Sequence, residues 1–180
     1  MERARIDGVE LAYELRGSGA PLVMIHGAQG DQTMFAGLAS ACASGFRVLT
    51  FDQRGSGLSE KPDMDYSIAM LADDTAALID HLGLSPAHVI GVSMGGMIAQ
   101  ELALRHPGKV RSLVLGCTTP GGPRAIHAEG NALAAACACS CCRRVRPSST
   151  ARSSAPSAPI PRSSMSFVPS ILGRSPASTA

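Results

Sequence analysis

Strand-like and helix-like patterns of apolar residues alternate over the first 118 residues of the chain. Five stretches favour strands, four of them short apolar runs: PLVMIHG (21–27), FRVLTFD (46–52), HVIGVS (88–93), VRSLVLG (110–116) and the partly alternating VELAYELRG (9–17). Apolar residues at helical spacing lie between them, at 32–44, 66–84 and 94–106. Buried strands that alternate with helices indicate the α/β class, with a mostly parallel sheet covered on both faces.

The longest helical pattern, residues 66–84, predicts both a buried and a solvated face. Its apolar positions recur at steps of three and four residues, and Gly83 follows the expected helix end. Asp73 and Asp74 fall outside the apolar stripe, so we expect both carboxylates on the solvated side of an amphipathic helix.

The composition of the chain changes after residue 118, and this change divides it into three segments. Residues 1–118 form the predicted core, and residues 119–136 begin with turn residues and are expected to start a covering region, or cap. Residues 137–180 are low in complexity, because Ser, Ala, Pro and Arg supply 34 of the last 50 residues. Such a segment cannot bury enough apolar surface to offset its ordering entropy, so disorder is predicted.

The net charge of +2 averages two unlike parts of the chain. Residues 1–130 carry 10 basic and 14 acidic side chains, whereas residues 131–180 carry six arginines and no acid. A basic tail can bind nucleic acid, but this one lacks the interleaved aromatic rings that stack on bases. The tail also holds cysteines without the paired spacing of a zinc site, at Cys137, Cys139, Cys141 and Cys142. We expect neither a nucleic-acid partner nor a metal.

The hydropathy of the chain also predicts its compartment. No apolar run approaches the roughly 20 residues that a membrane span needs. The charged N-terminus is not followed by the apolar stretch of a secretory signal. We therefore expect a cytoplasmic protein with no membrane partner, whose six cysteines stay reduced.

The candidate chemistry lies in GVSMGG, residues 91–96, where a serine stands between glycines. Gly91-x-Ser93-x-Gly95 follows a predicted strand and opens a predicted helix, which is the setting of a nucleophile elbow. Such a turn strains the serine backbone and raises its hydroxyl above the sheet, while the glycines let neighbouring backbone pass. The helix N-terminus also favours developing negative charge. The alternative is an ordinary glycine-rich turn between strand and helix.

Three further motifs occur in a consistent order around this serine. They are VMIHGAQGD (23–31), FDQRGSGLS (51–59) and MIAQELALRHPGKVRSLVLG (97–116). With the serine motif, they resemble the α/β-hydrolase superfamily, in particular its small cap-bearing esterases, lactonases and haloperoxidase-like members. The resemblance covers about residues 1–130 and implies the α/β-hydrolase fold.

The resemblance also implies roles for individual residues. Ser93 would be the nucleophile, and the backbone N–H groups of Ala28 and Met94 would form the oxyanion hole. His26, followed by Gly27, would hold the loop that presents Ala28 rather than act as a base. The implied reaction cleaves a small ester or lactone through an acyl-enzyme without a cofactor. Acyl transfer and perhydrolysis stay open, because they use the same serine turn.

A serine needs a base to take its proton and an acid to orient that base. In this fold both follow the serine along the chain. The acids after Ser93 are Glu101 and Glu129, and the histidines are His106 and His127. His106 is expected about 18 Å away, at the far end of the helix that Ser93 opens. The triad is therefore predicted to be incomplete.

Other polar residues have simpler interpretations. Asp52 and Arg54 are expected to brace their own loop as a pair. The slot after the strand 110–116, where some relatives place the acid, reads Cys117-Thr118-Thr119.

The resemblance implies a longer chain with further strands, and it is lost near residue 135. We hypothesise a frame shift or a non-native end there, because out-of-frame codons of a GC-rich gene give Ala, Arg, Pro, Ser and Cys. The strand 110–116 would then be an exposed apolar sheet edge that pairs with itself. The second function hypothesis is accordingly an inactive remnant of such a hydrolase.

Overall fold

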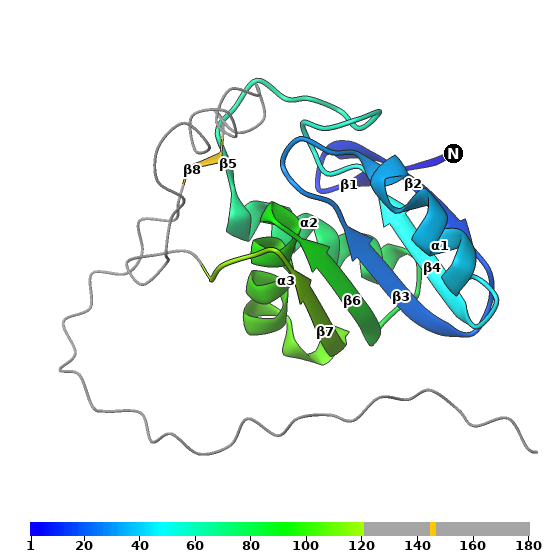
Figure 1. Ribbon diagram of the computed structural model, residues 1–180. Coiled ribbons are helices and arrows are strands. Elements are labelled where there is room, and N and C mark those ends of the chain that lie inside the picture. The colour runs from blue at the N-terminus through cyan, green and yellow to red at the C-terminus, as the bar shows by residue number, and fades with distance from the viewer. Residues whose placement is uncertain (121–144, 147–180) are drawn as a thin grey trace, which may run out of the picture.

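The computed structural model of the protein describes residues 1–120 and residues 145–146. Its main element is a six-stranded sheet in the order β1-β2-β4-β3-β6-β7 (Figure 1). The strands are β1 (Glu2–Ile6), β2 (Val9–Arg16), β3 (Ala20–Ile25), β4 (Phe46–Phe51), β6 (Ala87–Val92) and β7 (Val110–Gly116). The neighbouring pairs from β4 to β7 run parallel, whereas β2 pairs antiparallel with both β1 and β4. The predicted α/β fold with a mostly parallel sheet is confirmed.

Strand β1 was not predicted from the apolar pattern, because three of its five residues are charged. It forms a hairpin with β2 in which Ile6 pairs with Val9 across the two-residue turn Asp7-Gly8. Asp7 and Gly8 both have positive φ, 45° and 86°. This is the backbone of a tight hairpin turn, and Asp-Gly is a sequence that favours it. The Asp-Gly sequence of this turn was therefore the feature from which β1 could have been predicted.

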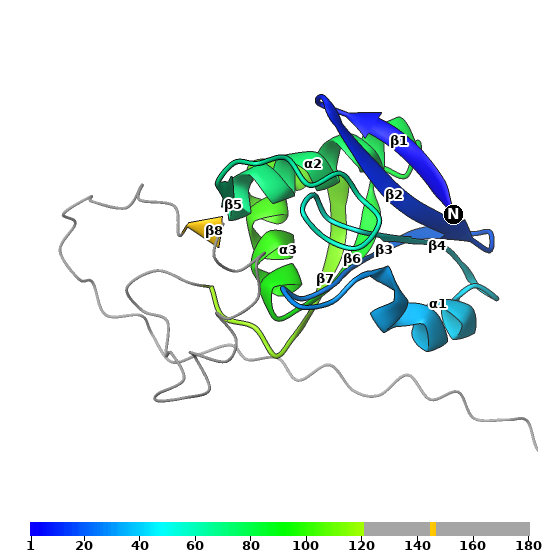
Figure 2. The same cartoon turned by 90° about the horizontal axis from the view of Figure 1, so that it is seen from above.

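Helices cover both faces of the sheet, as Figure 2 shows. Helices α2 (Ile68–His81) and α3 (Met94–Arg105) lie on one face, and the 3-10 turn η1 (Gln32–Phe35) with α1 (Ala36–Cys42) lies on the other. The core is accordingly divided into a larger cluster under α2 and α3 and a smaller one under α1. Helix α2 begins at its cap Ser67, whose hydroxyl accepts from Met70 N–H at 3.1 Å, and Gly83 follows its end with a φ of 63°.

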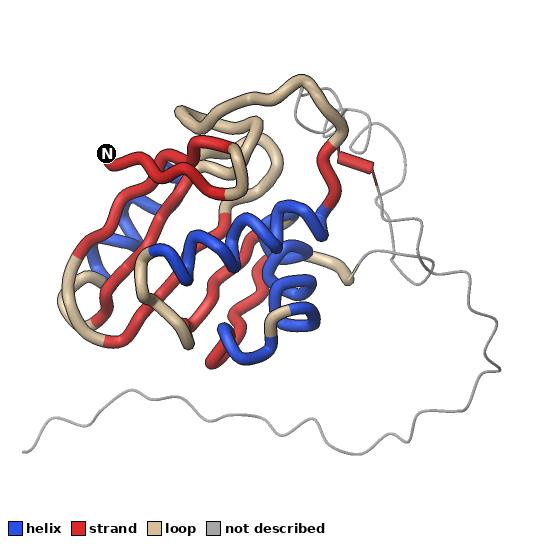
Figure 3. The backbone as a smooth tube through the Cα atoms, turned by 180° about the vertical axis from the view of Figure 1, so that it is seen from behind, coloured by secondary structure: helices blue, strands red, loops and turns tan. Residues whose placement is uncertain are grey.

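The carboxyl ends of the parallel strands meet at one edge of the sheet, and some of the loops drawn in tan in Figure 3 emerge there. These loops follow β3, β4, β6 and β7. In open α/β sheets this edge is where ligands bind. The fold thus brings the serine motif to the same edge as the loops of the motifs 23–31 and 51–59.

The two outer strands of the six-stranded sheet differ in character. The exposed residues of β1 are charged, namely Glu2, Arg3 and Arg5. On β7, Val114 is 57% exposed and Leu115 is 43% exposed. Within residues 1–120 and 145–146, β7 therefore ends the sheet with an apolar edge, as expected for the strand 110–116.

A second, two-stranded sheet joins distant parts of the chain. Strand β5 (Tyr66–Ser67) pairs in parallel with β8 (Val145–Arg146), which lies within the segment 137–180 predicted to lack structure. The remainder of that segment, its cysteines, and all but the first two residues of the expected cap at 119–136 lie outside the described residues.

Candidate functional site

Ser93 occupies the junction between β6, which ends at Val92, and α3, which begins at Met94. Its backbone has a φ of 56° and a ψ of −122°. A positive φ outside glycine costs on the order of 1–3 kcal/mol and persists only where the surroundings impose it. Ser93 is thus held in the strained turn that its motif predicts, at the N-terminus of a 12-residue helix.

The glycines of the motif are required by backbone contacts. A β-carbon on Gly91 would overlap the carbonyl of Gly95, and one on Gly95 would overlap the carbonyls of Ile25 and His26. Strand β6, the start of α3 and the end of β3 therefore approach one another more closely than side chains would allow. This close approach places Ser93 beside the loop that follows β3.

The loop after β3 lies directly against the Ser93 side chain. A β-carbon on Gly27 would lie 3.2 Å from Ser93 Cβ and 3.7 Å from Ser93 Oγ. Ala28 follows Gly27 in this loop, and Met94 follows Ser93 at the first position of α3. The first N–H groups of a helix have no intrahelical acceptor, so an anion beside them is stabilised. The residues singled out in the sequence thus gather at one place.

His26 is completely buried, and both of its ring nitrogens are engaged away from Ser93. Nδ1 lies 2.8 Å from Gly27 O, a carbonyl that can only accept, so this nitrogen carries the proton. Nε2 accepts from the backbone N–H of Gln53 at 3.3 Å. Burial lowers the pKa of the ring, against the opposing effect of the bond to Gly27 O. A neutral ring bonded in this way is a support for the loop.

Gln53 is a support that the sequence did not reveal. Its side-chain amide donates to His26 O at 2.6 Å, so the loop after β4 is attached twice to the loop after β3. Nothing in the local pattern of FDQRGSGLS separates this glutamine from a solvent-exposed one. Only the three-dimensional proximity of the two loops identifies it.

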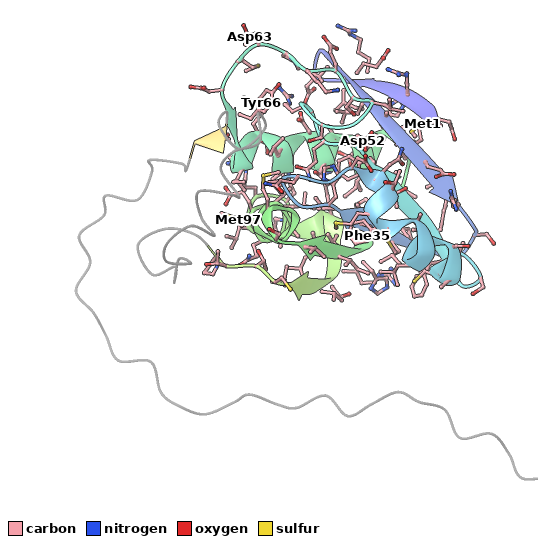
Figure 4. All side chains as sticks on the ribbon, turned by 45° about the horizontal axis from the view of Figure 1, so that its top comes forward. Met1, Phe35, Asp52, Asp63, Tyr66 and Met97 are labelled. Carbon is pink, nitrogen blue, oxygen red and sulfur yellow. The ribbon has the colours of Figure 1, made fainter. Side chains whose placement is uncertain are left out.

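The prediction that Asp52 and Arg54 pair with each other is wrong. Asp52, which is labelled in Figure 4, accepts from the backbone N–H groups of Gln32 at 2.8 Å and Leu58 at 2.7 Å. It thereby connects η1 with the loop after β4. Arg54 instead forms a two-pronged, buried ion pair with Asp74 of α2, with both bonds at 2.5 Å. The two residues do not pair because their side chains point in different directions. The Asp52 carboxylate points toward backbone N–H donors, whereas the Arg54 side chain extends to helix α2.

The expectation that Asp74 is solvated is therefore wrong as well, since it is 4% exposed. Asp73 fits the expectation better, with a side chain that is 39% exposed. It accepts from Arg105 at 2.7 Å and lies 2.7 Å from His106 Nε2. These bonds, the one from Arg105 first, lower the pKa of Asp73.

No histidine in residues 1–120 forms a hydrogen bond with Ser93. His106 caps the far end of α3, about 18 Å along the helix, and pairs with Asp73. His88 bonds to Ser112, and His81 lies exposed at the end of α2. His127 and Glu129 lie outside the described residues.

The described residues were also compared with the requirements of a metal site and of a membrane-spanning helix. Among the described residues, no three His, Cys, Asp or Glu side chains come together as a metal ion would require. None of the described helices has the length and apolar character to cross a membrane.

The sheet topology and the serine turn together define an α/β hydrolase, and the comparison with known families agrees. Residues 20–133 match the family model for the alpha/beta hydrolase fold, which is more than half of the chain, so the protein belongs to that family.

Named relatives give this assignment more detail. The chain is 45% identical over 112 residues to a Mycobacterium tuberculosis protein that carries the provisional name non-heme bromoperoxidase BpoC, covering 61% of this chain and 42% of the relative. A thermophilic esterase from Thermogutta terrifontis is 32% identical, with a TM-score of 0.65 over 68% of this chain and 48% of that one. Est816, an N-acyl homoserine lactone degrading enzyme, is 32% identical, with a TM-score of 0.64 over 68% of this chain and 49% of that one.

The relatives bear on both function and length. An esterase and a lactone-degrading enzyme among them show that the family is enzymatic and support a hydrolase function. The chain spans less than half the length of each of these three relatives.

Proposed function

We propose that the chain carries the nucleophile and the oxyanion hole of a serine hydrolase for small carboxylic esters or lactones. In the first step Ser93 Oγ attacks the carbonyl carbon, its proton passes to a base, and the carbonyl oxygen takes up the negative charge. The N–H groups of Ala28 and Met94 stabilise that oxyanion. Collapse breaks the bond to the alcohol oxygen, which takes the proton from the base, and leaves an acyl-serine; water then hydrolyses it to the acid and frees the Ser93 hydroxyl.

The observation that carries this proposal is the backbone conformation of Ser93. A φ of 56° at a serine between a parallel strand and a helix N-terminus, with the Gly27 loop against its side chain, is the geometry that exposed nucleophiles use. Serine at this position favours acyl transfer chemistry over the aspartate-based reactions of related dehalogenases and epoxide hydrolases.

A second candidate, an inactive remnant, is favoured by the histidines. Each histidine in residues 1–120 is bonded elsewhere or lies at the far end of its helix, so this part of the chain offers Ser93 no base. A serine without a base reacts slowly. We propose that the chain has little activity of its own.

A fluorophosphonate probe separates the two candidates. Strong labelling of the full chain that disappears in Ser93→Ala would support a working hydrolase. The remnant is supported if the probe leaves Ser93 unlabelled and p-nitrophenyl acetate turnover equals that of the Ser93→Ala variant. Labelling at another serine would contradict the assignment of Ser93.

We also propose that β7 pairs with β7 of a second copy. The exposed β7 residues include one charge, Arg111, whereas those of β1 are all charged and discourage pairing. In an antiparallel pair about a two-fold axis at Leu113, Arg111 of each copy lies opposite Leu115 of the other. No like charges then face each other, so the edge is complementary to itself.

A further inference from the structure

The carbonyl oxygen of Ser93 accepts a side-chain hydrogen bond from far along the chain. Thr118 Oγ1 donates to Ser93 O at 2.7 Å, from the loop that follows β7. Gly116, the last residue of β7 just before this loop, accepts from Ser93 N–H at 2.9 Å through its carbonyl. Ser93 O also accepts from the backbone N–H groups of Gly96 at 3.0 Å and Met97 at 3.3 Å, in the first turn of α3. Thr118 is therefore the side-chain donor to an oxygen that the helix already holds.

Gly96 provides the space in which Thr118 lies. A β-carbon on Gly96 would be 2.5 Å from Thr118 Cβ, 2.6 Å from Cγ2 and 2.6 Å from Oγ1. The threonine side chain thus packs directly on the first turn of α3. One turn later, the Gln100 side chain donates to Gly96 O at 3.0 Å and to Thr119 O at 3.2 Å. The loop is attached to the helix at successive residues, which fixes where Thr118 stands.

The bond from Thr118 acts on a particular peptide unit. The carbonyl of Ser93 and the N–H of Met94 belong to the same planar group, and they point in opposite directions. A donor added to this oxygen, beside the N–H groups of Gly96 and Met97, therefore restricts the direction of the Met94 N–H further. Donation to the oxygen also polarises the peptide and strengthens its N–H as a donor.

We infer that Thr118 is a positioning residue for the oxyanion hole, and that Gly96 leaves room for it because it has no side chain. This inference rests on the proposed function, in which Met94 N–H stabilises the oxyanion. Thr118 touches no reacting atom and acts through the Ser93–Met94 peptide.

The test compares Thr118→Val, which keeps the shape and loses the donor, with Thr118→Ser, which keeps the donor. The full chain is labelled with ¹⁵N, and the Met94 amide resonance is followed. We expect it to move in Thr118→Val and to stay near its wild-type position in Thr118→Ser. Ser44→Ala, which removes an exposed hydroxyl bonded to Ala41 O, serves as a remote control. If the Met94 resonance is the same in all variants, the inference is wrong.

Probe labelling gives the functional readout. The maximal rate of fluorophosphonate labelling at Ser93 should fall about tenfold in Thr118→Val, with probe binding unchanged, because the oxyanion donor is misaimed. Thr118→Ser should recover the rate to within about twofold of the wild type. Gly96→Ala should lower the rate as Thr118→Val does, by displacing the threonine. If the wild type is labelled, equal labelling of Thr118→Val would overturn the inference.

The two readouts keep the inference separate from the proposed function. If the wild-type chain is not labelled, the hydrolase proposal loses its support, while the Met94 resonance still decides the role of Thr118. A shifted Met94 resonance with recovery by serine supports the positioning role in either case.

Discussion

Arg54 and Asp74 form a buried, two-pronged ion pair that attaches the loop after β4 to α2, with side chains 7% and 5% exposed. The guanidinium Nε and one terminal nitrogen each donate to a separate carboxylate oxygen. This pair, rather than the adjacent Asp52, determines where the loop stands relative to the helix.

Removing one partner of this pair should be costly. Asp74→Asn or Arg54→Leu leaves an uncompensated buried group, and we expect a loss of about 3–5 kcal/mol in the free energy of unfolding. Urea denaturation measures it. Asp80→Asn is the matched control, because the pair of Asp80 with Lys109 is exposed and should contribute less than about 1 kcal/mol. Equal costs for the two sites would contradict the buried role.

The buried ring of His26 should make stability depend on pH. Its pKa is lowered in the folded chain, so between that value and the unfolded pKa of about 6.5 the unfolded state binds more protons. The stabilising contribution is therefore fully present above about pH 6.5 and is lost as the pH falls toward the folded pKa. Urea midpoints at pH 7, 6 and 5 should decline accordingly. His26→Asn should flatten this dependence, whereas His81→Gln should leave it intact.

The glycines around Ser93 should respond differently to an added methyl group. Gly27→Ala puts a carbon 3.2 Å from Ser93 Cβ, so we expect slower probe labelling with a nearly unchanged urea midpoint. Gly95→Ala meets rigid backbone and should lower the free energy of unfolding by about 1–3 kcal/mol or more. Gly108→Ala, where nothing lies within 4 Å, is the control for both. A fully labelled Gly27→Ala would contradict the contact with Ser93.

The apolar edge of the sheet should drive association. Val114→Lys places a charge on the β7 edge, and we expect it to shift the chain from dimer toward monomer in light scattering after gel filtration. Leu104→Lys is the control, because Leu104 is 79% exposed but lies on α3. A wild-type chain that is monomeric at all concentrations would exclude the pairing.

The sequence predicted most of the fold because its strands are apolar runs and its helices have regular apolar spacing. It missed β1, where Glu2, Arg3 and Arg5 interrupt the apolar pattern and only the Asp7-Gly8 turn marks the hairpin. Edge strands are often charged, so hydropathy alone identifies them poorly.

The candidate site was predictable where it depends on neighbours in the chain. Ser93 and its flanking glycines lie within five consecutive residues, so the strained turn could be predicted from that stretch alone. Thr118 bonds to Ser93 across 25 residues of sequence, and Asp74 bonds to Arg54 across 20. No local pattern reports such contacts, so the pairing of Asp52 with Arg54 was predicted wrongly and the role of Thr118 was missed.

The unequal edges of the sheet also set a limit on how far self-pairing can proceed. Charged β1 forms the other border of the six-stranded sheet, so within the described residues two chains that meet through β7 leave this sheet with β1 at both of its borders. Growth would stop after a single symmetric union instead of continuing into a fibril. A chain whose sheet had two apolar edge strands could continue to add copies at both edges.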